Sequence, residues 1–326
     1  MSIQRISLGT VGALALGAAV AGGVSSSTVL SLLTQAIIYA VFAIGVGLLL
    51  RQNGMVSFGH ALFFGFSGYA VGIILQLKLM PAEAAIVLTL AGMALMAFLM
   101  GLVIVRVPGV AFGMLTLAIG QMFYLTASRS RGLTGGADGM NIEWPATLFG
   151  VAQSQLLKPA SIFLLCWTTL VLVMLLLTLL LRSRFGSITE AVRDNEERAR
   201  FIGIQTLLPR AAVYALSATV TGLAGLLSAL NTGFVSPENL HWSLSGVALM
   251  MVVVGGYKAL WGPALGAVVY FLAKDILGDF ANHWMAIFGI ALITVIVFSP
   301  TGIAGALERL RKGKKTLPTA KAPAGH

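Results

Sequence analysis

Charge is scarce in this chain. There are 21 Lys and Arg and 11 Asp and Glu among 326 residues, so 10% of the chain is charged, against about 25% in soluble domains. A soluble fold must cover its surface with polar groups, so this scarcity excludes a soluble globular protein. The hydrophobic fraction of 58% also excludes intrinsic disorder, whose signature is low hydrophobicity. A membrane protein with several spans is what remains.

Cysteine and paired histidine are scarce as well. Cys166 is the single cysteine, which excludes an intrachain disulfide, a thiolate metal cluster and a CxxC site. The four histidines His60, His241, His283 and His326 show no metal-ligand spacing, so no metal site is expected. The sequence has no GxxxxGK[ST], HExxH or GxSxG motif. We therefore expect no enzyme, no cofactor and no nucleotide site in this chain.

The apolar segments predict an all-α, polytopic transmembrane helical bundle. A spanning helix needs about 20 mostly apolar residues. Ten segments qualify: 8–24, 28–50, 55–77, 82–105, 109–127, 159–181, 210–232, 244–257, 263–278 and 284–299. The short pair within 244–278 is either two tilted spans or one broken unit. We expect one transmembrane domain over 1–308, with an outer loop at 128–158 and a basic tail at 309–326.

The distribution of Lys and Arg predicts the orientation. With both termini cytoplasmic, the inner segments hold 16 of these 21 residues and the outer segments hold 5. This asymmetry follows the positive-inside rule. It places residue 145 outside and residue 195 inside. The basic tail is then expected to attract anionic lipid, and nucleic acid is not expected as a partner.

The first apolar stretch allows a second interpretation. Arg5, an apolar run and Ala19-Val20-Ala21 resemble a short signal peptide. Removal of this stretch would leave nine spans and move the new N-terminus outside. Retention is the expectation, because only one positive charge precedes the run and the run continues past the cleavage-like site.

The longest inner polar segment predicts a short amphipathic helix over 187–203. Ser187 and Glu190 have capping-box spacing, and Gly203 is placed to end the helix. One face, interrupted at Asn195, would carry Ile188, Ala191, Val192, Ala199 and Ile202. Such a helix either lies in the lipid interface or docks in a groove of a cytoplasmic partner. Four acidic residues favour docking, because anionic lipid would repel them.

Six motifs in a fixed order are the most specific signal. They are GMVSFGHALFFGFSGY at 54–69, VPGVAFGMLTLAIGQM at 107–122, LTGGADG at 133–139, EAVRDNEERARFIGI at 190–204, GFVSPE at 233–238 and GGYKALWGPALG at 255–266. Together they resemble the permease subunit of bacterial branched-chain amino acid ABC importers, specifically the M-type member of the permease pair. Asn53, Tyr257 and Lys258 depart from the pattern of that family.

This resemblance implies a heteromeric importer in the bacterial inner membrane, with ABC importer permease architecture. The chain and a second homologous permease would form the pathway for branched-chain or related amino acids. Two cytoplasmic ABC ATPase subunits would bind and hydrolyse ATP, and a periplasmic substrate-binding protein would deliver the substrate. A urea or short-amide importer is the alternative, and a standalone carrier or channel is a third. The spans contain too few ionisable residues for an ion-driven pump.

The resemblance also implies a role for segment 187–203 as the coupling helix that contacts the ATPases. The residues that match the family pattern are Glu190, Ala191, Arg193, Asn195, Glu196, Ala199 and Gly203. Among these, Arg193, Asn195 and Glu196 carry polar groups able to bond across an interface, which makes them natural probes of coupling.

Candidate pathway or gate residues lie in the first three motifs. They are Ser57, His60, Thr116, Gln121, Gly135, Gly136 and Asp138. The glycines permit positive φ and Asp138 can cap a turn, so this loop is either a tight turn or a gate or docking contact. Small residues around His60 favour close helix packing or unwound backbone beside a substrate. Gln35 and Asn231 are further uncharged polar residues that either line a path or tie helices together.

Overall fold

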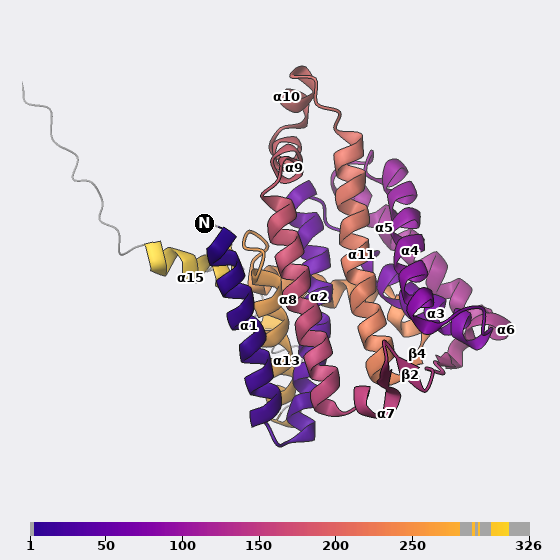
Figure 1. Cartoon of the computed structure of the whole chain (residues 1–326). Helices are drawn as coiled ribbons and strands as arrows, with labels where there is room; N and C mark the ends of the chain where they lie inside the picture. Colours follow the sequence, from indigo (N-terminus) through magenta and orange to yellow (C-terminus); the bar gives the residue numbers. More distant parts are fainter. Residues whose placement is uncertain (1–2, 281–288, 291–292, 294–300, 313–326) are drawn as a thin grey trace, which may run out of the picture.

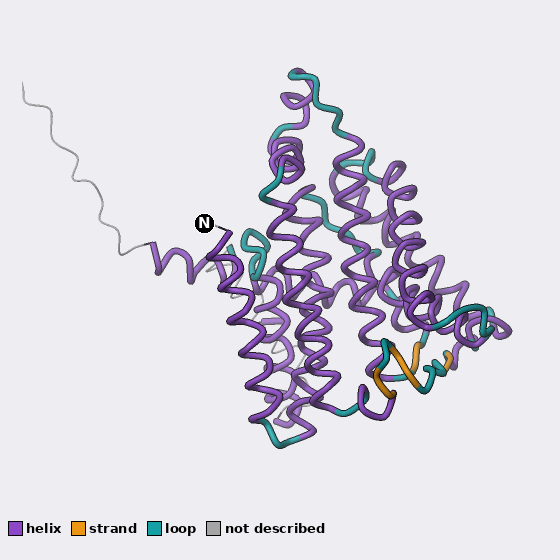
Figure 2. The backbone as a smooth tube through the Cα atoms, in the orientation of Figure 1, coloured by secondary structure: helices purple, strands orange, loops and turns teal. Residues whose placement is uncertain are grey.

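The computed structural model describes the backbone of residues 3–280, 289–290, 293 and 301–312. Figure 1 shows a bundle of long helices with short elements at both ends. In the described part of the chain, the strands form two antiparallel pairs, and each strand has two residues, as Figure 2 shows. The predicted all-α polytopic bundle is confirmed.

Nine of the ten expected spans correspond to helices. These are α1 (Ile3–Gly23), α2 (Ser27–Asn53), α3 (His60–Gln76), α4 (Ala82–Ile104), α5 (Gly109–Arg129), α8 (Pro159–Leu181), α11 (Leu207–Thr232), α12 (Trp242–Gly255) and α13 (Gly262–Phe280). Most of the tenth, 284–299, lies outside the described residues. Five of the described helices, α2, α4, α5, α8 and α11, are by themselves long and apolar enough to cross a membrane. The apolar helices α3 and α12 are shorter.

Helix α2 forms the centre of the bundle. It packs against α8, α11, α12 and α13, and most of its residues from Ala36 to Leu49 are buried. A Cβ atom at Gly47 would lie 2.6 Å from Cγ of Pro263, so glycine is needed for α13 to approach this closely. The helix starts at its N-cap Ser26 and ends at Gly54, whose φ of 66° terminates it in the left-handed region.

The segment 244–278 forms two helices joined by a short turn. Helices α12 and α13 pack against each other and are joined by the turn 256–261. Added Cβ atoms at Gly255 and Gly266 would collide with backbone atoms of Gly262 and Met251, respectively. The glycines that suggested a break in the sequence therefore serve close helix packing.

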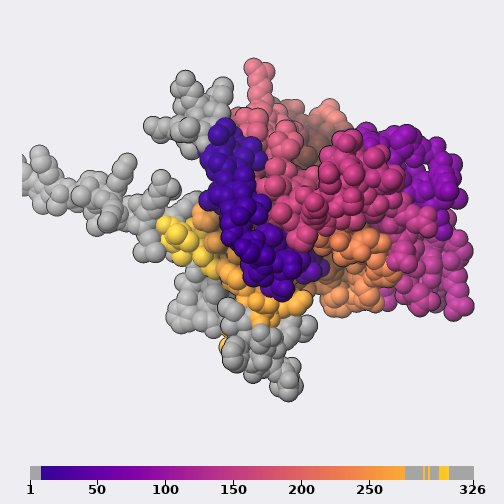
Figure 3. Space-filling view, turned by 60° about the horizontal axis from the view of Figure 1, so that its bottom comes forward, coloured from indigo at the N-terminus to yellow at the C-terminus, as the bar shows by residue number. Residues whose placement is uncertain are grey.

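Helix α1 lies on the surface of the bundle. It contacts α8, and Nε1 of Trp167 on α8 donates to the carbonyl oxygen of Ala13 at 2.8 Å. Figure 3 shows this indigo helix on the outside, next to yellow residues of α15 (Gly302–Lys312). The expected boundary between domain and tail, at 308, falls inside α15, and residues 313–326 lie outside the described part.

Short elements gather at the lower end of the molecule in Figure 1. The segment expected as an outer loop contains α6 (Arg131–Thr134), η1 (Gly136–Asp138), β1 (Met140–Asn141), β2 (Thr147–Leu148), β3 (Val151–Ala152) and α7 (Gln153–Leu156). Strand β1 pairs antiparallel with β4 (Phe234–Val235), which is followed by η2 (Pro237–Leu240), and β2 pairs with β3. The two halves of the chain thus meet in a small folded cap.

Two further helices lie at the opposite end, at the top of Figure 1. They are α9 (Arg184–Asp194) and α10 (Glu196–Phe201), which follow α8 and precede α11. Most of the basic residues of the middle of the chain are in this segment. The long polar segments at 128–158 and 182–209 therefore lie at opposite ends of the bundle, as the predicted topology requires.

Candidate functional site

The helix expected at 187–203 begins earlier than predicted. Helix α9 starts at Arg184, because the Oγ atom of Ser183 accepts from the backbone N–H of Phe185 at 3.2 Å. The prediction of a start at Ser187 is therefore wrong. Its capping-box partner Glu190 stands too far into the helix to cap it. Two serines four residues apart can both cap, and the end of α8 at Leu181 makes the first of them the one used.

The segment is also two helices and not one. Asn195 is extended, with φ −158° and ψ 100°, and its Oδ1 atom accepts from the backbone N–H of Arg198 at 2.9 Å. Asn195 thus ends α9 and caps α10. The predicted end near Gly203 is confirmed, since this residue has φ 84° and the N–H of Ile204 donates to the carbonyl oxygen of Ala199 at 3.0 Å.

Of the five residues predicted to share one apolar face, Val192 and Ala199 are buried and Ile188, Ala191 and Ile202 are exposed, so the prediction of a single face is wrong. Gly186, Thr189 and Val192 are the buried residues of α9, whereas Ile188 and Ala191 are exposed. In α10 only Ala199 is buried. The break at Asn195 changes the direction of the chain, so residues on either side of it cannot share one face.

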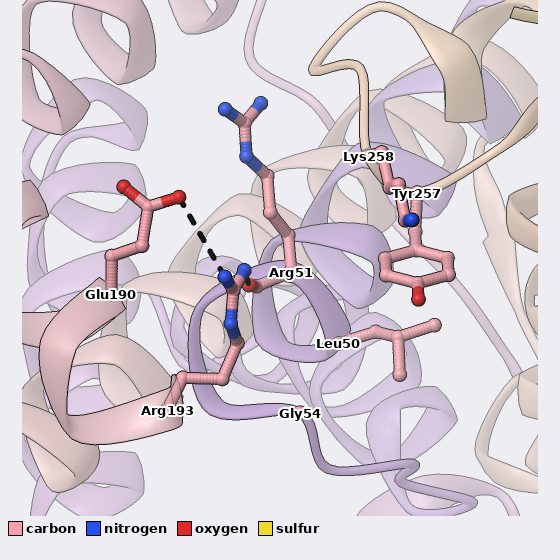
Figure 4. A pocket seen from close by; sticks show the side chains of 7 residues that line it. All are labelled: Leu50, Arg51, Gly54, Glu190, Arg193, Tyr257 and Lys258. Carbon is pink, nitrogen blue, oxygen red and sulfur yellow. Dashed lines mark hydrogen bonds and ion pairs between the residues drawn. The ribbon is translucent and has the colours of Figure 1, made fainter. Parts of the chain in front are cut away.

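Helix α9 is fixed to the C-terminal end of α2. The Thr189 hydroxyl donates to Oε1 of Gln52 at 2.8 Å, and Nη1 of Arg193 donates to the carbonyl oxygen of Arg51 at 2.6 Å. The second bond satisfies one of the carbonyls that every helix end leaves without an intrahelical partner. Arg193 also contacts Asp194 at 2.6 Å and Glu190 at 3.7 Å, as Figure 4 shows for the latter. Arg193 is thus committed to its own chain.

Helix α10 is fixed to the start of α11 through Glu196. Its carboxylate pairs with Nη1 of Arg210 at 2.6 Å and with Arg200, and it accepts from the Thr206 hydroxyl at 2.9 Å. Burial alone would raise the pKa of Glu196. The hydrogen bond from Thr206 and the charges of Arg210 and Arg200 outweigh that effect and leave the pKa lowered. Glu196 is therefore an ionised anchor of α10.

A further hydrogen bond completes the contacts that hold α9 and α10 in place. We call these contacts the seat; they comprise Arg51, Gln52 and Asn53 with Thr189 and Arg193, and Glu196 with Thr206 and Arg210. The Asn53 side-chain amide donates to the carbonyl oxygen of Arg210 at 3.0 Å, which joins the end of α2 to the start of α11. Arg51, Gln52 and Asn53 therefore each bond to a segment distant in the sequence. These contacts join α9 and α10 to two largely buried spans, α2 and α11.

The seat leaves an apolar tip exposed. Phe201 is 90% exposed and Ile202 is 71% exposed, at the far end of α10. The predicted coupling residues Glu190, Ala191, Asn195 and Gly203 are exposed as well, whereas Ala199 is buried. Sequence reasoning missed Phe201, which was not considered as a contact. The available signal was a Phe-Ile pair directly before the helix-ending glycine.

A pocket of about 540 Å³ lies beside α9. It is lined by Leu50, Arg51, Gly54, Glu190, Arg193, Tyr257 and Lys258. Figure 4 shows that these residues come from the end of α2, from α9 and from the turn after α12. Tyr257 and Lys258, which depart from the family pattern, thus meet the predicted coupling residues at one place.

Three of the predicted pathway residues form a buried network. His60, which is fully buried, lies with Nδ1 2.8 Å from Oγ of Ser57 and with Nε2 2.6 Å from Oγ of Ser217. The Ser217 hydroxyl donates to the carbonyl oxygen of Gly45 at 2.7 Å. Thr116 accepts from the N–H of Phe58 at 3.2 Å. This network ties the turn before α3 to α2, α5 and α11.

The remaining pathway candidates lie elsewhere. Gln121 on α5 has a buried side-chain oxygen with no hydrogen-bond partner in the described part of the chain. Gly135 and Gly136 have φ of 76° and 66°, as the sequence predicted. Asp138 is exposed in η1 and is not close to the buried network. The structure therefore separates the candidates into a buried network, an isolated amide and a surface loop.

Gln35 and Asn231 meet in a second, polar pocket at the lower end. This pocket has a volume of about 220 Å³. Its lining comprises Gln35, Ile38, Tyr39, Ser228, Asn231, Thr232, Phe234, Ser236 and Asn239. None of these side chains carries a formal charge at neutral pH. The sequence suggested the two amides separately, and only the packing of α2 on α11 brings them together.

Comparison with known proteins places this geometry in a family. A family model described as the branched-chain amino acid transport system permease component matches residues 28–297. The LivM permease protein of the high-affinity branched-chain amino acid transport system of Escherichia coli is 24% identical, over 86% of this chain and 70% of the relative. The LivM protein of Salmonella typhimurium is 24% identical, over 83% and 68%, respectively.

A second group of relatives carries a different name. The autoinducer 2 import system permease protein LsrC of Escherichia coli is 27% identical, over 89% of this chain and 84% of the relative. No solved structure matches the chain. The family match covers most of the spans and the seat of α9. The chain therefore belongs to the branched-chain amino acid transport permease family and is a multi-pass permease subunit of an ABC transporter.

Proposed function

We propose that this chain forms, with a second homologous permease, the membrane pathway of an ATP-driven importer for branched-chain or related amino acids. The observation that supports this proposal is the position of Phe201 and Ile202. Both side chains are exposed, while the helices α9 and α10 next to them are bonded to the end of α2 and the start of α11. Large apolar side chains this exposed on a polar segment are typical of a protein interface.

The partner proposed for this tip is a cytoplasmic ABC ATPase subunit, of which two would serve the two permeases. ATP is bound and hydrolysed there, and this chain contributes no catalytic residue or cofactor. Phe201 and Ile202 would enter an apolar groove of the ATPase, as anchors at the centre of interfaces do. Movement of the ATPase would then reach α2 through Thr189 and Arg193, and α11 through Glu196.

The proposed orientation has α9, α10 and both termini in the cytoplasm of a bacterium, with the chain in the inner membrane. The basic residues of the segment between α8 and α11 support this orientation. The cap that contains η1 and β1 would then face the periplasm. A periplasmic substrate-binding protein is the partner proposed for it, with Asp138 as an exposed contact.

The proposed substrate follows from the family and from the relatives named LivM. The uncharged polar pocket around Gln35 and Asn231 suits a solute without net charge, such as a zwitterionic amino acid. A short amide such as urea has the same property and is the alternative outcome of an uptake assay. A standalone carrier is the outcome if uptake needs no ATPase.

Co-purification with the co-encoded ATPases tests the proposal. We expect Phe201→Ala with Ile202→Ala to reduce recovery of the ATPases and to abolish ATP-dependent uptake into vesicles. Phe149→Ala is the matched control, since Phe149 is 63% exposed at the opposite end of the molecule. It should leave ATPase recovery unchanged. Full recovery and uptake in the double variant would remove the docking role from the tip.

A further inference from the structure

The pocket beside α9 has an excess of positive charge. Of its seven lining residues, Arg51, Arg193 and Lys258 are cationic and Glu190 alone is acidic. They belong to three separate elements, as Figure 4 shows, so the fold and not the local sequence gathers them. Like charges at close range repel one another, and an anion between them would offset that repulsion.

Arg193 uses the acidic groups on its own helix. Glu190 and Asp194 both lie within ion-pair distance of Arg193. Lys258 is exposed and forms no ion pair with any residue that the structure describes. Its ammonium group therefore retains its charge and its donors for a ligand.

The pocket lies at the level where membrane spans end. Arg51 is in the last turn of α2, and Lys258 follows α12 closely. Leu50 and Tyr257 add an aliphatic and an aromatic side chain next to the cations. Aromatic side chains are enriched at the interface between hydrocarbon and water, and basic pockets between spans on the cytoplasmic side bind lipid headgroups.

Helix α15 adds an independent observation at the same place. It contacts α12 and α13, and Figure 1 shows it projecting sideways from the bundle. An added Cβ at Gly256 would lie 3.3 Å from Cα of Gly302, so the start of α15 adjoins the turn that carries Lys258. The sequence of α15 includes Arg309, Arg311 and Lys312. A basic amphipathic helix that lies beside a bundle is typical of binding to anionic lipid.

We propose that this pocket binds the phosphate group of an anionic phospholipid from the surrounding membrane. Lys258 and Arg51 donate to the phosphate oxygens, and the apolar part of the headgroup region meets Leu50 and Tyr257. Because Arg193 lines the same pocket and fixes α9 to α2, an occupied pocket stabilises the seat of the coupling helix. The inference rests on the proposed function in one respect, because the proposed orientation decides which leaflet supplies the lipid. Lipid binding itself requires no transport.

A free phosphate would present the same oxygens. The membrane source is favoured because the headgroup layer holds phosphate at the depth of the pocket and because two lining residues are suited to the interface. An acidic side chain of the ATPase partner is a different occupant. It would require the partner for any effect, whereas a phospholipid binds the permease alone.

Lipid retention by the purified full-length chain tests the proposal. After exchange into mixed micelles with phosphatidylglycerol or phosphatidylcholine, native mass spectrometry counts the bound lipids. We expect preferential retention of phosphatidylglycerol, reduced about fivefold by Lys258→Gln and further by Arg51→Gln, as expected for about 1 kcal/mol for each cation near the surface. Arg106→Gln is the control, because Arg106 is an exposed cation at the same end, bonded to its own helix through the carbonyl oxygen of Leu102.

Three results would overturn the inference. One is equal retention of both lipids by the wild-type chain. Another is retention by the Lys258 and Arg51 variants at the level of the Arg106 variant. The third is displacement of phosphatidylglycerol by millimolar inorganic phosphate, which would make the pocket a site for a free anion. Equal melting temperatures of all variants in phosphatidylcholine would exclude misfolding as the cause of any loss.

Discussion

The hydroxyl of Thr189 on α9 donates to Oε1 of Gln52 at the end of α2, although the two residues are 137 positions apart in the sequence. Both side chains are buried at this contact. A buried side-chain acceptor that loses its donor keeps the cost of its desolvation. This bond therefore fixes the position of α9 on α2 more strongly than an exposed bond would.

Thr189→Val should loosen this seat. Valine has a similar shape but cannot donate, so Oε1 of Gln52 is left without its partner, at a cost of about 1–3 kcal/mol. We expect assembled transporter in which ATP hydrolysis continues while uptake falls. Paired measurements of hydrolysis and uptake in proteoliposomes check this.

The control for that variant is Thr178→Val. The Thr178 hydroxyl bonds only within its own helix, to the carbonyl oxygen of Met174 at 2.6 Å. Its loss should leave the ratio of uptake to hydrolysis unchanged. An unchanged ratio in the Thr189 variant too would mean that the bond to Gln52 carries no force.

The anchor of α10 should depend on pH through Glu196. Its pKa is lowered in the folded state, so its contribution to stability is complete above the unfolded pKa and is lost as the pH falls through the folded pKa. Protonation at a pH below the folded pKa removes the ion pairs with Arg210 and Arg200. We expect the hydrogen-exchange protection factors of α10, which correct for the intrinsic pH dependence of amide exchange, to fall on acidification in the wild-type chain.

The variant Glu196→Gln isolates this effect. Glutamine cannot ionise, so the protection factors in α10 should be low at neutral pH and nearly independent of pH. Glu197→Gln is the neighbouring control, because Glu197 is exposed and forms no ion pair within the described residues. Wild-type protection factors in α10 that equal those of the Gln variant at neutral pH would show that Glu196 does not anchor α10.

The long apolar helices could be predicted from the sequence, but the seat of α9 could not. Composition alone placed a span at 28–50, and α2 covers Ser27–Asn53. The bonds of Gln52, Asn53 and Arg210 join segments that are distant in the chain, and no local spacing encodes them. The choice between Ser183 and Ser187 as the cap likewise depends on where α8 ends.

The predicted coupling residues show the same limit. The family pattern gave Arg193 and Glu196 as probes of the interface, yet both are bonded within the chain. Their exposed neighbours, with Phe201 and Ile202 at the tip, are the groups free to meet a partner. A helical wheel over 187–203 could not separate them, because the break at Asn195 removes the single helix that a wheel assumes.

The topology can be checked at two points. Reporter fusions should place residue 145, in the cap, outside and residue 195, between α9 and α10, inside. The two points lie at opposite ends of the bundle. Reporters that give the same side for both would contradict the proposed orientation.

The cap should affect uptake without affecting assembly. Asp138 is exposed, so Asp138→Lys reverses a surface charge at no cost in packing. We expect reduced uptake with normal membrane insertion and normal recovery of the ATPases, because a reversed charge at an interface mainly weakens encounter with the partner. Glu143→Lys, also exposed in the cap, tests whether the effect is specific to the loop. Normal uptake by the Asp138 variant would leave this loop a structural turn.

The buried network distinguishes a structural histidine from one that lines the pathway. Ser217→Ala removes the group that lies 2.6 Å from Nε2 of His60 and that donates to Gly45, so two buried polar atoms lose a partner. We expect a loss of stability of about 1–3 kcal/mol, visible as a lower melting temperature. The KM for uptake should not change in the fraction of the protein that remains folded. Thr219→Ala is the matched control on the same helix, since Thr219 bonds only to the carbonyl oxygen of Ala215. If instead the Ser217 variant keeps its melting temperature and changes the KM for uptake, His60 belongs to the substrate path.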